Sequence, residues 1–263
     1  MSKVIFNRRR FLTLGGAGLV GTTLAGCDAF DSFARPGHPV RDFLIGANEM
    51  TMAVQRTLLG SEALAKEFSE SEIRQGMRPN GSTDPNNPDY LALRETDFSQ
   101  YSLEVGGLVD NPGRYSLDAL RNMPSRTQIT RHDCVEGWSC IAKWTGVPLG
   151  LILDEAQPRS NANYVVFHCF DIYSGGLSGG VPYYESIDMV DAYHPQTILA
   201  YGMNDAALPV ANGAPLRVRV ERQLGYKMAK YIQRIELVES FADLHGGKGG
   251  YWEDRGYEWY AGI

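Results

Sequence analysis

The irregular order of strand-like and helix-like segments is the feature that most limits what this 263-residue chain can fold into. Alternating or β-branched residues predict strands around residues 103–105 and at four later segments, 126–133, 164–169, 216–220 and 231–238. Short helices are predicted between them, at Leu117–Asn122, which Ser116 can cap, and at 148–155. Because strands and helices do not alternate in turn, we predict an α+β fold with mixed β-sheets and short helices instead of a doubly wound sheet.

The chain before residue 90 is predicted to be helical, with one long loop. Apolar residues at near-helical spacing predict a helix at 40–59 and a weaker one at 62–74. The segment RPNGSTDPNNPD at 78–89 is rich in residues that break both helices and strands, so a long loop is expected there. The Gly-rich aromatic tail at 241–263 has two interpretations, a strap against the domain or a docking surface for a redox partner, and we favour the strap.

The first 27 residues are typical of an export signal. The run Arg8, Arg9, Arg10 precedes an apolar, Gly-rich stretch at 13–26 that is too short to span a bilayer as a mature helix. This pattern resembles a twin-arginine signal, and LAGC, which ends at Cys27, resembles a lipoprotein cleavage box. We expect export to the periplasm or cell envelope and a lipid anchor on Cys27, with Asp28 retaining the protein at the inner membrane. Cleavage nearby without acylation is the alternative.

The charge balance argues against one class of partner. Residues 1–27 hold four bases and no acid, which leaves 21 bases against 31 acids and a formal charge of −10 for the remainder. A surface this acidic repels the phosphate backbone, so we expect no nucleic-acid partner.

The cysteines pose a separate question. If Cys27 is acylated, Cys134, Cys140 and Cys169 remain, an odd number, so at least one of them cannot form an intramolecular disulfide. A free thiol in an oxidising compartment needs protection by burial or by a ligand.

A local excess of bases interrupts the acidic chain. Within eighteen residues there are six bases against one acid: Arg217, Arg219, Arg222, Lys227, Lys230 and Arg234 against Glu221. Such a cluster suits a bound anion such as a phosphate. The alternative is a solvated strand face, on which Arg217 and Arg219 lie opposite the apolar residues of 216–220. The preceding turn, NGAP, beginning at Asn212, offers amides and an Asn side chain to a polar ligand.

Five motifs in order resemble one enzyme family. They are GGLVDNPG at 106–113, RHDCVEGWS at 131–139, HPQTILAY at 194–201, NGAPLRVRV at 212–220 and GYKMAKYIQRIEL at 225–237. Together they resemble the sulfite oxidase family of molybdopterin enzymes, and within it the bacterial branch of periplasmic methionine sulfoxide reductases. The resemblance implies a sulfite oxidase-type molybdopterin-binding domain at 77–240, after a signal at 1–27 and a helical segment at 28–76, and before the tail at 241–263.

The resemblance also implies a cofactor and its contacts. Mo-molybdopterin would be held with Cys134 as the thiolate ligand of the metal, and a soft thiolate suits that role. Arg78 stands where oxidase members place a catalytic, substrate-binding arginine. Nine residues match or lie at cofactor-binding positions: Asn80, Thr83, Asp84, Cys169, Asn212, Arg217, Met228, Ala229 and Lys230.

The implied function is two-electron oxygen-atom transfer on a small sulfur-containing or other oxo substrate. The sequence has no CxxCH haem motif, so we expect electrons to pass through a separate carrier, either a membrane haem protein or a soluble cytochrome. The resemblance further implies a monomer, because the dimerisation domain of longer oxidases has no counterpart here.

A protein of a different class remains as the alternative. A non-catalytic copper- or zinc-binding lipoprotein could use His132, Cys134, His168 and Cys169 as ligands, since their spacings permit ligation and soft ligands suit copper. This alternative leaves the six bases and the NGAP turn without a role.

Overall fold

The computed structural model describes residues 38–60, 62–173 and 180–263, and it divides into two units, Met1–Thr51 and Met52–Ile263. Helix α3 (Pro39–Leu59) confirms the helix predicted at 40–59. None of the helices in the described ranges is long and apolar enough to cross a membrane. The signal and Cys27 lie outside the described residues, so their roles stay predictions.

Two β-sheets form the second unit. The first sheet has the order β2 (Gly113–Ser116), β1 (Ser102–Gly107), β10 (Ile232–Val238), β5 (Tyr164–Tyr173) and β6 (Val181–Asp188). Strands β1 and β10 are parallel and the other neighbours antiparallel, so this sheet is mixed. The second sheet has the order β3 (Arg126–Cys134), β4 (Trp138–Pro148), β7 (Ile198–Met203) and β8 (Ala206–Ala207), and β9 (Arg217–Arg219) also pairs with β7.

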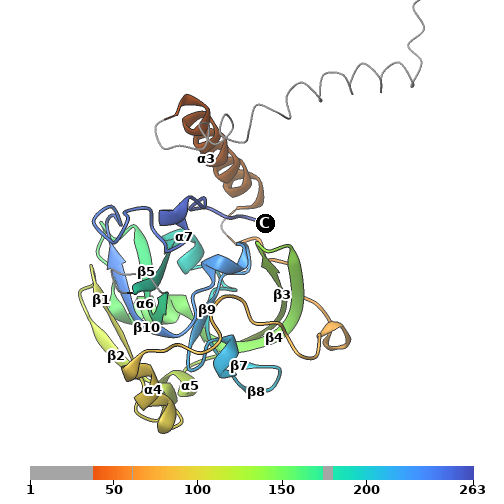
Figure 1. Cartoon of the computed structure of the whole chain (residues 1–263), viewed down its shortest axis with the longest axis vertical. Helices are drawn as coiled ribbons and strands as arrows, with labels where there is room; N and C mark the ends of the chain where they lie inside the picture. The colour runs from red at the N-terminus through yellow and green to blue at the C-terminus, as the bar shows by residue number, and fades with distance from the viewer. Residues whose placement is uncertain (1–37, 61, 174–179) are drawn as a thin grey trace, which may run out of the picture. The chain divides into compact units, whose positions relative to one another are not determined.

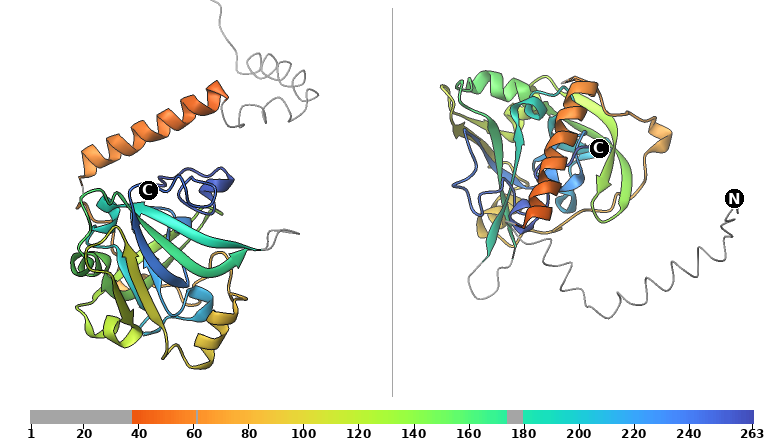
Figure 2. Two further views of the ribbon diagram at one scale, coloured as in Figure 1. Left: turned by 90° about the vertical axis from the view of Figure 1, so that its left-hand side faces the viewer. Right: turned by 90° about the horizontal axis from the view of Figure 1, so that it is seen from above.

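Short helices connect these strands. They are α4 (Pro88–Glu95), α5 (Leu117–Asn122), α6 (Leu149–Ala156) and α7 (Met189–Ala192), with 3-10 turns η2 (Glu70–Glu72), η4 (Val210–Asn212), η5 (Gly225–Lys227) and η6 (Glu253–Arg255). In Figure 1 and in the right-hand view of Figure 2, β3 and β4 lie on one side of the unit and β1, β2, β5 and β10 on the other. The predicted α+β class with mixed sheets is confirmed.

Local chemistry explains several of these boundaries. The Ser116 hydroxyl accepts a hydrogen bond from the backbone N–H of Ala119, so α5 begins where the sequence predicts. Helix α4 begins after Asn87, whose side chain accepts from two backbone N–H groups, with Pro88 at the first helical position. The predicted loop at 78–89 therefore ends in the first turn of a helix.

The apolar core lies mainly against the first sheet. The alternation at β1 buries Leu103 and Val105, which belong to one apolar cluster with Val165, Phe167 and Ile235 from β5 and β10 of the same sheet. A smaller cluster around Trp144 lies on the second sheet and includes Cys140, which is buried.

The helix predicted at 62–74 is wrong. In this segment only Glu70–Glu72 is helical, as a 3-10 turn. The backbone instead hydrogen-bonds to the β3–β4 hairpin, where the N–H of Phe68 donates to Ile129 and the N–H of Arg74 donates to Ile141. The β3–β4 hairpin thus supplies backbone hydrogen bonds in place of those that a helix would have formed.

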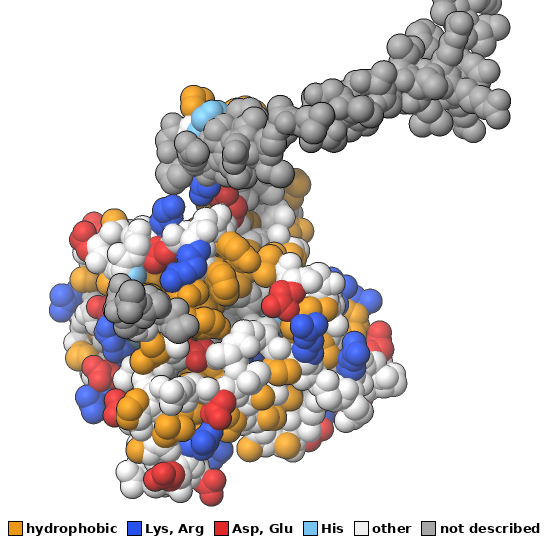
Figure 3. Space-filling model, in the orientation of Figure 1, with side chains coloured by type: hydrophobic (Ala, Val, Ile, Leu, Met, Phe, Trp, Pro, Cys, Tyr) orange, Lys and Arg blue, Asp and Glu red, His pale blue; other side chains and the backbone are white. Residues whose placement is uncertain are grey.

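The solvated strand face considered for β9 is wrong as well. Arg217 and Arg219 are both fully buried, as is Val218 between them. Their guanidinium groups lie 4.9 and 4.3 Å from the ring centroid of Trp144, which is also buried. On the face drawn in Figure 3, acidic and basic side chains are interspersed among hydrophobic ones, whereas the bases of β9 are inside the molecule.

The tail at 241–263 packs against the domain as a strap. Gly250 pairs with Glu185 of β6, and Gly262 pairs with Gln223. Tyr251 and Ala261 are buried. The favoured interpretation of the tail is therefore confirmed.

Candidate active site

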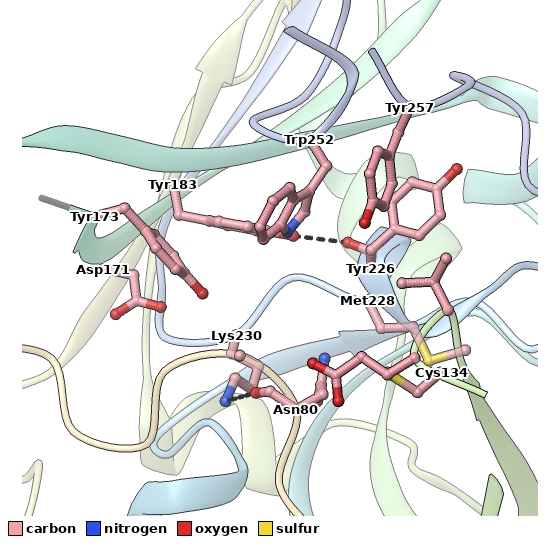
Figure 4. A pocket seen from close by; sticks show the side chains of 13 residues that line it. Asn80, Cys134, Asp171, Tyr173, Tyr183, Tyr226, Met228, Lys230, Trp252 and Tyr257 are labelled. Carbon is pink, nitrogen blue, oxygen red and sulfur yellow. Dashed lines mark hydrogen bonds between the residues drawn. The ribbon is translucent and has the colours of Figure 1, made fainter. Parts of the chain in front are cut away.

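A pocket in the second unit brings together Cys134 and several of the predicted cofactor residues. As Figure 4 shows, Asn80, Cys134, Met228 and Lys230 lie on one side of it, and tyrosine and tryptophan rings lie on the other. Its lining consists of Asn80, Gly81, Cys134, Val135, Glu136, Asp171, Tyr173, Tyr183, Tyr226, Met228, Lys230, Trp252 and Tyr257. The pocket therefore has a polar side and an aromatic side.

Cys134 is positioned by a hairpin. It is the last residue of β3, it pairs with Trp138 of β4, and its carbonyl accepts a hydrogen bond of 3.0 Å from Gly137 in the connecting turn. Gly137 has a φ of +84°, which favours glycine at that point of the turn. Burial raises the pKa of the Cys134 thiol, so the thiol stays protonated until a cation such as a bound metal favours the thiolate.

Lys230 joins the long loop to the pocket. Its ammonium group donates to the carbonyl oxygens of Asn80 at 2.5 Å, Ser82 at 2.5 Å and Ala211 at 3.2 Å, and it forms no ion pair with a carboxylate in the described residues. Burial, assisted by the charge of Arg217, lowers the pKa of Lys230 to about 7. An anion in the pocket would pair with the charged form of Lys230 and so offset the free-energy cost of burying that charge.

Arg217 lies in a similar environment. It is fully buried and donates to the carbonyl oxygens of Asn212 at 2.8 Å and Met228 at 3.5 Å. Burial, assisted by Arg219, lowers the pKa of Arg217 to about 9. A buried guanidinium that hydrogen-bonds to carbonyl groups and forms no ion pair lacks a negative partner, which an anionic ligand would supply.

Unpartnered polar atoms test whether these residues fit the cofactor. Among the described residues, eight buried side-chain nitrogen or oxygen atoms have no hydrogen-bond partner, and three of them are Asn80 Oδ1, Asn212 Nδ2 and Arg217 Nε. Leaving such an atom unsatisfied costs about 1 to 3 kcal/mol. All three belong to predicted cofactor residues, so the donor and acceptor set fits a polar, anionic group such as a pterin phosphate.

The other four bases of the cluster are already paired with carboxylates. Arg219 pairs with Glu221 at 2.6 Å, Arg222 with Asp191 at 2.9 Å, and Arg234 with Glu236 at 3.1 Å. Lys227 lies between two glutamates. Of the six bases, only Arg217 and Lys230 therefore remain as candidates for binding an anion.

None of the remaining predicted residues lines the pocket, and neither does Asn212 or Arg217. Arg78 is exposed, with its guanidinium 3.5 Å from Glu136 and 5.3 Å from the ring centroid of Trp138. Thr83 and Asp84 are exposed, and Asp84 pairs with Arg94. Their roles toward substrate and cofactor stay predictions.

Cys169 and Ala229 are part of the apolar core, and both are buried. Burial raises the pKa of the Cys169 thiol well above its ordinary value, so the thiol is neutral. The carbonyl of Ala229 accepts a hydrogen bond from Val218. A backbone role for Ala229 and a pterin contact from Cys169 stay predictions.

Sequence reasoning missed the aromatic side of the pocket and the carboxylate of Asp171. Asp171 and Glu136 line the pocket together with Tyr173, Tyr183, Tyr226, Trp252 and Tyr257. The density of aromatic residues in the tail was the one available signal, and it did not indicate which rings face a ligand.

The copper or zinc site is wrong. Across the described ranges, no three or more His, Cys, Asp and Glu side chains are grouped so that they could hold a metal ion. His132 lies on the second sheet, where its Nδ1 is 2.9 Å from Arg219 Nη1. His168 lies on the first sheet and pairs with Glu236 at 2.8 Å. These histidines therefore have structural partners on separate sheets.

The fold and the pocket define a cofactor-binding site that contains a thiol, Cys134, and a cation without a carboxylate partner among the described residues, Lys230. The family model described as "Oxidoreductase molybdopterin binding domain" matches residues 90–244, more than half of the chain. The chain belongs to this family and is a molybdopterin-dependent oxidoreductase whose cofactor is Mo-molybdopterin.

Individual relatives agree with this assignment. The chain is 37% identical over 254 residues to the putative protein-methionine-sulfoxide reductase subunit YedZ1 of Azospira oryzae, covering 97% of this chain and 86% of that protein. It is 38% identical over 169 residues to the protein-methionine-sulfoxide reductase catalytic subunit MsrP of Xanthomonas axonopodis pv. citri, covering 61% of this chain and 51% of the relative. The chain thus spans about half the length of that relative.

Among solved structures, the sulfane dehydrogenase SoxCD from Paracoccus pantotrophus is similar to this chain with a TM-score of 0.45 and 21% identity. The match covers 54% of this chain and 39% of that one.

Proposed function

We propose that this enzyme reduces neutral sulfoxides to sulfides. The observation that carries the proposal is the composition of the pocket, which combines five aromatic rings with two carboxylates, Glu136 and Asp171. Lys230 is the only cation among the described residues that line the pocket, and the anionic part of the cofactor would occupy it. The two carboxylates that remain repel a second anion such as sulfite, whereas sulfur and methyl groups pack well on aromatic rings. The names of the relatives, which describe methionine sulfoxide reductases, support the same substrate class.

The overall reaction takes a sulfoxide, two electrons and two protons to a sulfide and water. The bound cofactor supplies the two-electron redox change at molybdenum. In the proposed arrangement Cys134 holds the metal, while Arg217, Lys230 and Asn212 hold the anionic part of the cofactor through charge-assisted hydrogen bonds. The aromatic side of the pocket excludes water and orients the substrate.

The electrons are proposed to come from a separate carrier, a membrane haem protein or a soluble cytochrome. The sequence offers no haem attachment motif of its own.

We further propose that the protein is exported by the twin-arginine route and anchored by a lipid on Cys27, which would concentrate it near a membrane-bound carrier. Fractionation of cells that express the wild type or Cys27→Ala tests the anchor: the wild type should sediment with membranes and the variant should not. A soluble wild type would contradict the anchor.

Steady-state turnover tests the reaction itself. The purified holoenzyme is assayed with a reduced viologen dye and methyl phenyl sulfoxide, and in the other direction with sulfite and an oxidising dye. We expect dye oxidation with the sulfoxide and little or no turnover of sulfite. Efficient sulfite oxidation without sulfoxide reduction, by a preparation containing molybdenum, would contradict the proposal.

A further inference from the structure

The C-terminal strap contributes two rings to the pocket, at positions after the end of the family match at residue 244. From this arrangement we propose that Trp252 and Tyr257 determine substrate specificity by binding the apolar substituents of the sulfoxide. This inference rests on the proposed function and deepens it. It assigns the polar side of the pocket to the cofactor and the strap to the part of the substrate that does not react.

The two rings form one continuous surface. Trp252 and Tyr257 are stacked, with centroids 5.3 Å apart and planes inclined by 27°. The edge of Tyr226 meets Tyr257 at 5.2 Å, and Tyr173 lies 6.3 Å from Trp252. In Figure 4 these rings face Asn80, Lys230 and Cys134 across the pocket. A ligand bound near Cys134 would therefore have aromatic surface above it.

The rings are also accessible and retain polar atoms for a ligand. Trp252 is half-buried, and 38% of Tyr257 is exposed. In the described part of the chain, neither the indole N–H of Trp252 nor the hydroxyl of Tyr257 forms a hydrogen bond, whereas the hydroxyls of Tyr183 and Tyr226 each donate to a backbone carbonyl. Rings of this kind bind alkyl, aryl and sulfur groups and can donate to a sulfoxide oxygen.

A buried ion cluster fixes the strap next to residues 226–230, which contribute three side chains to the pocket lining. The ammonium group of Lys227 pairs with Glu185 of β6 at 2.5 Å and with Glu253 of the strap at 2.6 Å, and all three side chains are buried. Glu253 directly follows Trp252, and Lys227 directly precedes Met228 of the pocket. The Lys227–Glu253 ion pair thus fixes the position of the Trp252 ring relative to the polar side of the pocket.

Further contacts hold the rest of the strap in place. The hydroxyl of Tyr226 donates to the carbonyl of Glu258 at 2.6 Å, and the N–H of Leu224 donates to the carbonyl of Ala261 at 2.9 Å. A Cβ at Gly250 would lie 2.0 Å from Glu253 Oε2, so the strap passes too close to the ion cluster for a larger residue. These contacts make the strap a fixed wall, and a fixed wall can discriminate between substrates by size and shape.

Equilibrium binding of a substrate analogue tests this proposal without relying on turnover. Isothermal titration of the oxidised holoenzyme with methyl phenyl sulfone, a sulfoxide analogue that keeps the same substituents, measures Kd for the wild type, Trp252→Ala, Trp252→Phe and Tyr257→Ala. Tyr260→Phe is the matched control, because Tyr260 belongs to the strap but hydrogen-bonds to Gln55 outside the pocket. Molybdenum content is measured for every variant.

We expect Trp252→Ala and Tyr257→Ala to weaken sulfone binding about tenfold or more at unchanged molybdenum content, since truncating an aromatic anchor is typically costly. Trp252→Phe and the control should stay within about threefold of the wild type, since the ring or the pocket is preserved. If Trp252→Ala does not fold, Tyr257→Ala decides alone. Wild-type Kd values in the alanine variants, or a wild type that does not bind the sulfone, would overturn the proposal.

The result is independent of the proposed reaction. If the wild type binds the sulfone, the strap variants do not, and no sulfoxide is turned over, the proposed reaction is wrong but the binding role of Trp252 and Tyr257 is supported. If the wild type and the strap variants turn over sulfoxides equally well, the specificity role of Trp252 and Tyr257 is wrong and the proposed reaction is supported.

Discussion

At the scale of single residues, pairing with carboxylates separates the bases that serve the fold from those available to a ligand. The hydrogen bonds of the Arg217 and Lys230 side chains all go to carbonyl groups, whereas Arg234, from the same stretch of sequence, pairs with Glu236. The sequence shows the cluster, and the resemblance indicates Arg217 and Lys230. Only the structure shows that the others are unsuited. Arg222 and Lys227 pair with carboxylates of other segments, and Arg219 and Arg234 each pair with a glutamate two residues further along the chain.

Cofactor retention distinguishes the two kinds of base. Arg217→Ala should purify with less pterin and less molybdenum than the wild type, since losing a charge-assisted hydrogen bond is worth about 1.5 to 3 kcal/mol. Arg234→Ala, the matched control, should retain both at the wild-type level because Arg234 is partly exposed and already pairs with Glu236. Metal analysis and pterin fluorescence measure the outcome. Undiminished cofactor in Arg217→Ala would show that the arginine has no part in binding.

The pKa of Lys230 predicts how cofactor binding depends on pH. Burial lowers this pKa to about 7 in the cofactor-free chain. Below that pH the ammonium is already charged and can pair with a phosphate, whereas above it a proton must be taken up on binding. Retention of the cofactor should therefore weaken as the pH rises from about 6 to 9. Gel filtration followed by pterin measurement checks this. A Lys230→Gln variant should bind less cofactor and lose the pH dependence, and the same dependence in that variant would exclude Lys230 as its source.

At the scale of elements, local signals were reliable where an element has its own cap or a buried alternating face. Helix α5 with its Ser116 cap and strand β3 were predicted nearly to the residue. The segment 62–74 was mispredicted because its hydrogen-bond partners, such as Ile129, belong to a sheet edge far along the chain. Likewise β9 alternates in sequence but is buried on both faces, since Arg217 and Arg219 pack on Trp144.

The attachment of the strap gives a stability prediction. Lys227→Met should destabilise the protein by about 3 to 5 kcal/mol, because it leaves Glu185 and Glu253 buried together without their cation. Arg114→Met is the matched control: it breaks an ion pair with Glu104 in which both side chains are largely exposed, so about 0 to 1 kcal/mol is expected. Chemical denaturation of both variants at the same pH measures the difference. Equal midpoints for Lys227→Met and the wild type would contradict the role of the ion cluster.

At the scale of the whole molecule, the pocket is assembled from segments that are distant in sequence. Its lining comes from the loop around Asn80, the β3 end at Cys134, β5 and β6, the segment 226–230 and the strap. The resemblance predicted Asn80, Cys134, Met228 and Lys230 because they lie in recognisable motifs. The aromatic side could not be predicted, because its position depends on how the strap packs across β6 and η5.

The central claim is that Cys134 holds the molybdenum of a bound molybdopterin in this pocket. X-ray absorption at the molybdenum edge, on the wild type and on Cys134→Ser loaded with the same cofactor, tests it most directly because it counts sulfur neighbours of the metal. The substitution is nearly isosteric but replaces a soft thiolate with a hydroxyl that ionises poorly. We expect the wild type to contain molybdenum and the folded variant to show one sulfur neighbour fewer. An unchanged sulfur count in Cys134→Ser, or a wild type that binds no molybdenum, would contradict the account.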